Sequence, residues 1–344
     1  MEMAVVSLMP TDGLAYPVEL RRFGVEVTDL GLNTRWDPRA IRRAATVLRR
    51  LAPDIVHTHL KHADLVGALI APWRSAPMVS TLHRIEVEVT AGERAKRWAG
   101  AQARMRAAAR TIAVSEAQRQ WYLANFPVSP DEVVTVRNGV RTPPILDQAA
   151  REQLRASFGV PPRAVLAAMV GLMRPDKGHR TLVDAVARLE ASSDVWFLLV
   201  GDGPVKSELE DMVAALGPRG RRVIFAGYRT DVDALIQTAD LMVHPSLDDA
   251  LPTALIHGLA NGRPAVASAV GGIPEIVTRD TGVLVPPRDP AALAAAMAEL
   301  AGDEARRRQL GECATQRFYS EFHVEPWARR LRTVYEEALA RRRG

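Results

Sequence analysis

Short apolar runs alternate with longer amphipathic segments along most of the chain, a pattern typical of βαβ units. In the first half, we expect strands in MAVVSLM, VEVTDLGL, DIVHTHL, PMVSTLH, TIAVS and EVVTVRNGV. In the second half, we expect them in AVLAAMVGL, VWFLLVGDG, RVIFAGY, LMVHPS, PAVASAV and GVLVP. Segments with helical periodicity, such as residues 38–51, separate these runs. The alternation predicts an α/β protein in which helices cover parallel sheets.

The alternation is interrupted near the middle of the chain by the proline-containing stretch VRTPPILDQA. Because 344 residues are enough for two domains of ordinary size, we expect a doubly wound domain on each side of this stretch. The predicted parts are residues 1–145, residues 146–321 and a terminal segment over residues 322–344. Ligands bind at the carboxyl ends of strands in such sheets, so the cleft between the domains is the expected site.

The composition is that of a globular protein, with 47% hydrophobic and 25% charged residues. No apolar run reaches the roughly eighteen residues of a membrane-spanning helix. The first thirty residues lack the basic start and the cleavage site of a signal peptide, so we expect a cytoplasmic location. A single cysteine, Cys313, excludes an internal disulfide and a cysteine metal cluster.

The formal charge of +5 comes from 45 basic and 40 acidic residues, and arginine dominates the basic ones. Arginine is concentrated in AIRRAATVLRR and RAKRWAGAQARMRAAAR. These segments are either solvated helix faces or, for the one that carries Trp98, a surface that rests peripherally on anionic lipid at the inner face of the membrane. We do not expect nucleic acid as a partner, because few aromatic residues accompany the arginines and no recognition motif is present.

The stretch DDALPTALIHGLANGRP predicts a short helix over residues 252–260. Pro252 is suited to the first helical position, where its missing N–H costs nothing. Asn261 and Gly262 provide a left-handed end to the helix. The sequence therefore predicts an apolar helix that follows two carboxylates.

The start of this helix is a candidate anion site, because the free N–H groups near Thr253 concentrate partial positive charge. His257 lies one turn further along the same face. In the alternative interpretation, Asp248 or Asp249 only compensates the helix dipole, and His257 is a core histidine whose hydrogen bonds are satisfied.

A second candidate site follows the first strand of the second half, in VGLMRPDKGHRTLVDA. Arg174 and Lys177 stand there at the carboxyl end of the strand, where two cations three residues apart can bind a diphosphate. The alternative is a solvated turn, and the stretch has no GxxxxGK[ST] phosphate loop. Gly203, in GDGP, belongs either to a tight turn or to a ligand contact. Further on, Gly271 and Gly272 allow close approach of the backbone to a ligand.

The first half contains several histidines near predicted strand ends. His57 and His59 share one face of a strand, and His62 follows them. We do not expect a metal there, because no acidic or cysteine partner has a clear ligand spacing. His83 is a polar residue at a strand end, and Ser115 begins a helix either as its cap or as part of a cleft wall.

In their order along the chain, these motifs resemble the family 4 retaining glycosyltransferases, which have the GT-B fold of two Rossmann-like domains facing across a cleft. DIVHTHL, TLH and RNGV carry the resemblance in the first half, and residues 171–287 carry most of it. The resemblance implies transfer of a sugar from a UDP- or GDP-activated donor to a hydroxyl acceptor, such as a glycan, lipid-linked or cell-envelope precursor. It implies no metal and no other cofactor. It also implies that the terminal helix in FHVEPWARRLRTVYEEALARRR crosses back to the first domain.

The resemblance also implies roles for individual residues. Arg174 and Lys177 correspond to the pair that binds the donor diphosphate and stabilises it as a leaving group. Asp249 and His257 stand where the family usually has two glutamates, near the donor sugar and on the ribose. His83 corresponds to a catalytic histidine that faces donor and acceptor. The other implied positions are Leu251, Pro252, Thr253 and Gly203 for the donor, and His59 and Asn138 for the acceptor.

The sequence departs from the family in two places. Asp249 is one methylene shorter than glutamate, and a neutral His257 accepts from only one ribose hydroxyl. Relatives also open with a strand, a glycine-rich turn and a helix before the segment that MAVVSLM resembles. We therefore expect the first βα unit to be missing, through either a late start or a degenerate gene. A non-catalytic nucleotide-sugar-binding protein is the alternative, while a nucleotide-sugar epimerase would need further carboxylates that the sequence lacks.

Overall fold

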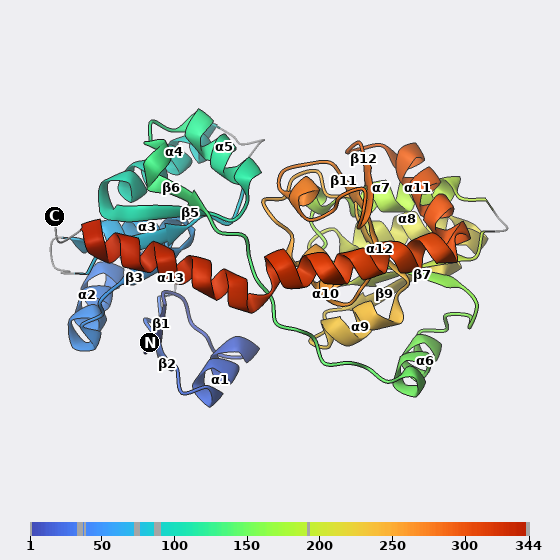
Figure 1. Cartoon of the computed structure of the whole chain (residues 1–344), viewed down its shortest axis with the longest axis horizontal. Helices are drawn as coiled ribbons and strands as arrows, with labels where there is room; N and C mark the ends of the chain where they lie inside the picture. The colour runs from blue at the N-terminus through green and yellow to red at the C-terminus, as the bar shows by residue number, and fades with distance from the viewer. Residues whose placement is uncertain are drawn as a thin grey trace.

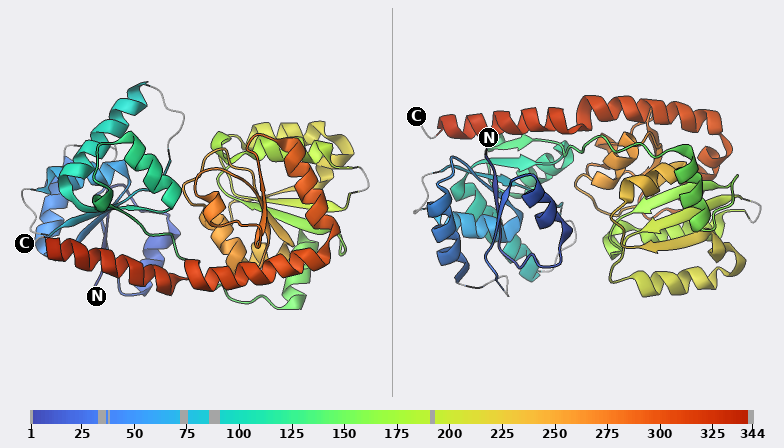
Figure 2. Two further views of the ribbon diagram at one scale, coloured as in Figure 1. Left: turned by 45° about the horizontal axis from the view of Figure 1, so that its top comes forward. Right: turned by 90° about the horizontal axis from the view of Figure 1, so that it is seen from below.

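The computed structural model describes residues 2–32, 37, 39–71, 76–85, 91–190 and 193–341. Helices and strands form two α/β halves that lie side by side, and the last two long helices run along both halves (Figures 1 and 2). Every strand that the sequence predicts is present. The expected α/β class is therefore confirmed.

Among its described residues, the first half has six parallel strands in two sheets. Strands β1 (Ala4–Ser7) and β2 (Glu26–Asp29) pair with each other. The second sheet has the order β3-β4-β5-β6, formed by Val56–His59, Met78–Thr81, Ala108–Ala113 and Val133–Thr135. The helices of this half are α1 (Ala15–Arg22), α2 (Arg39–Leu51), α3 (Leu60–Leu69), α4 (Ala91–Ala107) and α5 (Glu116–Asn125).

Within the described ranges, no strand joins β1 to β3, so the two sheets have separate edges. The apolar side chains Val6 on β1 and Val66 on α3 nevertheless belong to one cluster, which α2 completes with Ala40 and Ala44. The two sheets of the first half are thus connected through helices. Our expectation that a βα unit is missing stays a prediction.

The second half contains one parallel sheet of order β12-β11-β10-β7-β8-β9. Its strands, from β7 to β12, are Val165–Val170, Val195–Val200, Val223–Gly227, Leu241–His244, Ala265–Ser268 and Gly282–Val285. The helices α6 to α12 are Gln148–Ser157, His179–Arg188, Lys206–Ala215, Val232–Thr238, Thr253–Ala260, Pro290–Gly302 and Glu304–Arg317.

Strand β8 explains why this sheet is covered by helices on both faces. Its side chains are apolar at successive positions, and successive side chains of a strand point to opposite faces. Phe197 and Leu199 accordingly pack in one buried cluster, and Leu198 and Val200 pack in another. A continuous apolar run of this kind is what a parallel sheet between two helix layers requires.

The terminal helix α13 (Val324–Arg341) follows a short π-helical turn over residues 318–322 and returns to the first half. Val334 and Ala338 pack with Val79 of β4 and Ile112 of β5 in one buried cluster. The helix is therefore held against the first half by its apolar face, as the resemblance implies. The boundaries that we placed at residues 145 and 321 stay predictions.

Within the part of the chain that the structure describes, no helix has both the length and the apolar character needed to cross a membrane. Trp98 on α4 is 57% exposed, and Arg94 on the same helix is also exposed. The basic helix around Trp98 thus presents an aromatic side chain to solvent.

Candidate active site

The loop after β7 and the loop after β10 are packed backbone to backbone at the carboxyl edge of the second sheet. Gly178 has a φ of +73°, and a Cβ atom there would lie 1.8 Å from the carbonyl oxygen of Pro245. Only glycine permits this approach and this conformation. The backbone N–H of Leu247 also donates to the carbonyl of Asp176, at 2.8 Å. These contacts bring Lys177 to the loop that carries Asp249.

The two residues form an ion pair, with Lys177 Nζ 2.5 Å from Asp249 Oδ2. His244 Nε2 lies 3.2 Å from the same oxygen, and Ser246 Oγ lies 3.1 Å from His244 Nε2. Burial raises the pKa of Asp249, but the hydrogen bond from His244 and the charge of Lys177 outweigh it and hold that pKa below its usual value. Asp249 is therefore a carboxylate that faces the predicted phosphate-binding lysine.

Arg174 lies three residues before Lys177 and also faces a carboxylate. Its Nη2 donates to Asp176 Oδ2 at 2.6 Å, while its Nε atom is buried and has no partner among the described residues. The side chain is 32% exposed. Both cations of the loop are thus held near solvent by carboxylates that an incoming anion can replace.

Gly203 supports this loop from the neighbouring turn. A Cβ atom on Gly203 would lie 2.4 Å from the carbonyl oxygen of Met173, and one on Gly201 would lie 2.1 Å from that of Gly171. Met173 also donates its N–H to the carbonyl of Asp202 at 2.9 Å. The turn therefore positions the backbone that leads to Arg174, and a direct donor contact of Gly203 stays a prediction.

Helix α10 begins at Thr253, one residue later than predicted, because Pro252 has extended backbone angles and is the N-cap. Leu251 and Pro252 are buried, whereas Thr253 is exposed. The first residue of the helix is therefore exposed to solvent beside the Asp249 loop.

His257 has a partner that the sequence analysis did not identify. Its Nδ1 lies 2.8 Å from Asp233 Oδ1 on α9, and Asn261 Nδ2 donates to the same oxygen at 3.0 Å. Burial raises the pKa of Asp233, but these hydrogen bonds outweigh it and lower that pKa. When Nδ1 of His257 donates to Asp233, Nε2 is left as an acceptor on a side chain that is 31% exposed.

The histidines of the first half lie at the carboxyl ends of β3 and β4. His59 Nδ1 lies 2.8 Å from His83 Nε2, so the predicted acceptor-side and catalytic histidines are in contact. His57 Nε2 lies 2.7 Å from Thr81 Oγ1, and its Nδ1 lies 2.8 Å from the hydroxyl of Tyr335 on α13. Burial and the neighbouring histidines lower the pKa of His57 to about 3 and that of His83 to about 4. These imidazoles are neutral at pH 7.

The two halves are in contact close to His83 in the sequence. Ile85, two residues further on, packs with Val114 and with apolar residues of the second half. A Cβ atom on Gly271 would lie 3.4 Å from Ile85 Cδ1, and one on Gly272 would lie 2.8 Å from Ser115 Cβ. The glycine turn after β11 therefore contacts the first half next to the Asp249 loop.

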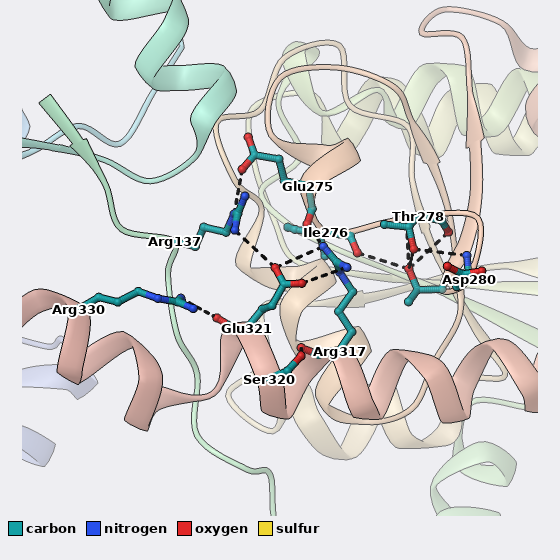
Figure 3. A network of polar contacts seen from close by, with 10 residues as sticks. Arg137, Glu275, Ile276, Thr278, Asp280, Arg317, Ser320, Glu321 and Arg330 are labelled. Carbon is teal, nitrogen blue, oxygen red and sulfur yellow. Dashed lines mark hydrogen bonds and ion pairs between the residues drawn. The ribbon is translucent and has the colours of Figure 1, made fainter. Parts of the chain in front are cut away.

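Glu275, which ends this glycine turn, connects the two halves through hydrogen bonds (Figure 3). Its carboxylate accepts from the N–H of Ala117 on α5 and from Arg137 Nε, both at 2.9 Å. Arg317 donates to its carbonyl oxygen at 2.8 Å. Asn138 follows Arg137, so it lies beside this connection, and its acceptor role stays a prediction.

Four functional candidates were missed by the sequence analysis, namely Asp233, His179, His244 and Ser246. Both ring nitrogens of His179 are buried without a partner among the described residues, and burial with nearby His244 and Lys177 lowers its pKa to about 4. The signal for His244 and Ser246 was available, because both are polar residues at the carboxyl end of the apolar run LMVHPS. Within the described ranges, no group of three metal-ligating side chains has the geometry to hold a metal ion.

Two families match the chain. Residues 1–142 match the Glycosyltransferase Family 4, and residues 164–303 match the Glycosyl transferases group 1. The second match contains the loops of Lys177 and Asp249, and the first contains His59 and His83.

Individual relatives agree with these families. The D-inositol 3-phosphate glycosyltransferase of Salinispora tropica is 31% identical, over 84% of this chain and 65% of that protein. The enzyme of the same name from Kineococcus radiotolerans is 30% identical, over 77% of this chain and 67% of that protein. The 2-deoxystreptamine N-acetyl-D-glucosaminyltransferase of Streptomyces fradiae is 29% identical, over 94% of this chain and 81% of that protein. The chain thus spans about two thirds of the length of the first two relatives.

Solved structures share the fold. HepE of Anabaena in complex with UDP-glucose superposes with a TM-score of 0.85 at 19% identity, over 98% of this chain and 99% of that one. The sucrose-phosphate synthase of Thermosynechococcus elongatus superposes with a TM-score of 0.82 at 21% identity, over 99% of both chains. The expected GT-B arrangement of two Rossmann-like domains is confirmed, and this chain belongs to the family 4 glycosyltransferases.

Proposed function

We propose that this protein transfers a sugar from a UDP- or GDP-activated donor to a hydroxyl acceptor with retention of the anomeric configuration. The observation that carries the proposal is the Lys177–Asp249 ion pair beside Arg174, at the sheet edge that faces the first half. The structure of HepE contains UDP-glucose, which supports a nucleotide-sugar donor for a chain of the same fold.

In the proposed complex, diphosphate oxygens replace Asp176 and Asp249 as partners of Arg174 and Lys177. The two cations and the start of α10 at Thr253 then lie where negative charge develops as the diphosphate leaves. Because these groups supply the positive charge, the proposed reaction needs no metal and no other cofactor.

Retention follows if the acceptor attacks from the side on which the diphosphate departs. The bond between the anomeric carbon and the phosphate oxygen breaks, the bond to the acceptor oxygen forms, and the departing phosphate takes the acceptor proton. Asp249, released from Lys177, accepts hydrogen bonds from sugar hydroxyls. The neutral imidazole of His83 binds a hydroxyl on the other side of the cleft.

The remaining site residues complete the two substrate positions. We assign the ribose to Nε2 of His257 and the rest of the donor to the segment that contains Leu251, Pro252 and Thr253, with Gly203 beside it. We assign the acceptor to the side of His59 and Asn138.

For the location of the protein, we propose the cytoplasm with peripheral contact at the inner face of the membrane. Support comes from the exposed Trp98 and Arg94 on α4 and from the net charge of +5. The acceptor would then be a glycan, lipid-linked or cell-envelope precursor.

The test is transfer from UDP-glucose, UDP-N-acetylglucosamine and GDP-mannose to inositol phosphate, with the product's anomeric configuration determined by NMR. An α-linked product from these α-linked donors, lost in Arg174→Ala/Lys177→Ala and kept in the exposed helix variant Arg188→Ala, supports the proposal. A β-linked product contradicts retention. Donor binding without any transfer or hydrolysis contradicts the enzyme and supports the non-catalytic alternative.

A further inference from the structure

The second half contains a cavity of about 850 Å³ that is separate from the candidate active site. Val165 at the start of β7, Asp240 just before β10 and Pro264 just before β11 line it. These positions are the amino ends of three parallel strands, whereas Lys177 and Asp249 follow the carboxyl ends of β7 and β10. The cavity is therefore at the sheet edge opposite to the candidate active site.

The lining of this cavity is rich in guanidinium groups. It contains six arginines and four carboxylates, so positive charge is in excess. The arginines come from α6, from the turn between α6 and β7, from the turn after α10 and from α12. The ones that carry the argument are Arg151, Arg155 and Arg263. Elements that are distant in the sequence thus direct arginines to one cavity.

A single carboxylate forms ion pairs with two of these three arginines. Asp240 Oδ1 lies 3.6 Å from Arg151 and Oδ2 lies 3.0 Å from Arg155. Oδ2 also accepts from the backbone N–H of Leu166 at 2.8 Å. Asp240 is therefore shared between two arginines and a backbone N–H.

Arg263 is that third cation. Its Nη2 donates to the carbonyl of Gln237 at 3.1 Å, but its Nε is buried and has no partner among the described residues. Burial and the positive charges of Arg151 and Arg155 lower the pKa of Arg263 to about 10, although the carboxylate of Asp240 acts in the opposite direction. Arg263 is half-buried, and three neighbouring guanidinium groups repel one another unless anions compensate them.

We infer that this cavity is a binding site for an anion with two linked phosphate groups, separate from the donor site. Planar guanidinium groups bind phosphate oxygens in bidentate fashion, and several of them suit a diphosphate. The volume is within the usual range of small-ligand pockets, so either inorganic pyrophosphate or the diphosphate of a nucleotide fits it.

The experiment is calorimetric titration of pyrophosphate into Arg174→Ala/Lys177→Ala, in which the donor site is disabled. We expect one binding event. Its affinity should fall at least tenfold when Arg151→Ala and Arg263→Ala are introduced into this variant as well, and should stay the same when Arg188→Ala is introduced instead. A parallel titration with UDP distinguishes the two sources, since tighter binding of UDP identifies a nucleotide.

Circular dichroism and thermal unfolding check that each variant folds. If Arg263→Ala does not fold, Arg151→Ala combined with the exposed Arg163→Ala tests the same cavity. Absence of pyrophosphate binding by the folded donor-site variant, or binding that these arginine substitutions leave unchanged, would overturn the inference. Neither result depends on transferase activity, so failure here is distinct from failure of the proposed function.

Discussion

Lys177 Nζ lies 2.5 Å from Oδ2 of Asp249, although the residues belong to loops after different strands. The approach depends on Gly178, which contacts the carbonyl of Pro245. In the proposed reaction, the donor phosphate binds Lys177, and the sugar hydroxyls donate hydrogen bonds to Asp249. The ion pair thus holds both groups in place until the donor arrives.

Asp249 is expected to act on the sugar rather than on the phosphate. Asp249→Asn should therefore lower kcat about a hundredfold, the range for loss of a preorganised electrostatic contact, while the Kd for UDP changes less than threefold. Asp249→Glu, which restores the family's usual residue, should keep measurable activity. Steady-state kinetics and UDP titration check this, and a loss of UDP binding in Asp249→Asn as large as the loss of kcat would refute the assignment.

Asp248 is expected to make stability depend on pH. Burial, with Asp249 adding to it, raises its pKa to about 6 from 3.8. The folded state therefore binds this proton more tightly, so the contribution of Asp248 to stability is greatest below pH 4 and is lost as the pH rises through about 6. Asp248→Asn should raise the free energy of unfolding by about 1 kcal/mol at pH 7.5, allowing for solvent screening, and by almost nothing at pH 3.5. Urea unfolding measures both, and an equal gain at the two pH values would rule out this titration.

The buried pair Asp64–Arg104 is expected to be essential for the first half. Arg104 Nη2 lies 2.6 Å from Asp64 Oδ2, and their side chains are 7% and 0% exposed. Asp64→Ala leaves a buried guanidinium without its carboxylate and should cost about 3–5 kcal/mol of unfolding free energy. The exposed Asp54→Ala should change it by less than about 0.5 kcal/mol. Urea unfolding distinguishes them, and a cost below about 1 kcal/mol for Asp64→Ala would contradict the prediction.

Glycine is expected to be required at position 272 for stability, because a side chain there would collide with the backbone of a neighbouring loop. A Cβ atom there would lie 2.0 Å from the carbonyl oxygen of Ala250, whereas one on Gly302 would have no atom within 4 Å. Gly272→Ala should therefore destabilise the protein by about 2 kcal/mol and reduce transfer by displacing the Asp249 loop. Gly302→Ala should be neutral or slightly stabilising. Thermal unfolding checks both, and equal melting temperatures of the two variants would show that the contact is unimportant.

Much of the fold was predictable from the sequence because it rests on local patterns. Continuous apolar runs such as Val195–Val200 identify strands covered on both faces. Lys177 and Asp249 were also predictable as neighbours, since parallel strands bring their carboxyl ends to one edge. The family resemblance then indicated which polar residues at that edge are candidates for binding the donor.

Contacts between side chains on different helices were not predictable. Asp233 holds His257 from α9, and nothing in either segment specifies the distance between them. The cavity of Arg151 and Arg263 likewise depends on how α6 packs against the turn after α10. In the sequence alone, such arginines are indistinguishable from solvated ones.

The measurement that tests the central claim most directly is calorimetric titration of UDP and GDP into the protein and into Arg174→Ala/Lys177→Ala. Each charged hydrogen bond to phosphate contributes about 1.5–3 kcal/mol. We therefore predict that the double variant weakens binding of the preferred nucleotide at least a hundredfold, while Arg151→Ala/Arg263→Ala leaves binding at the donor site unchanged. Equal affinity of the folded double variant and the parent protein would contradict the placement of the donor diphosphate.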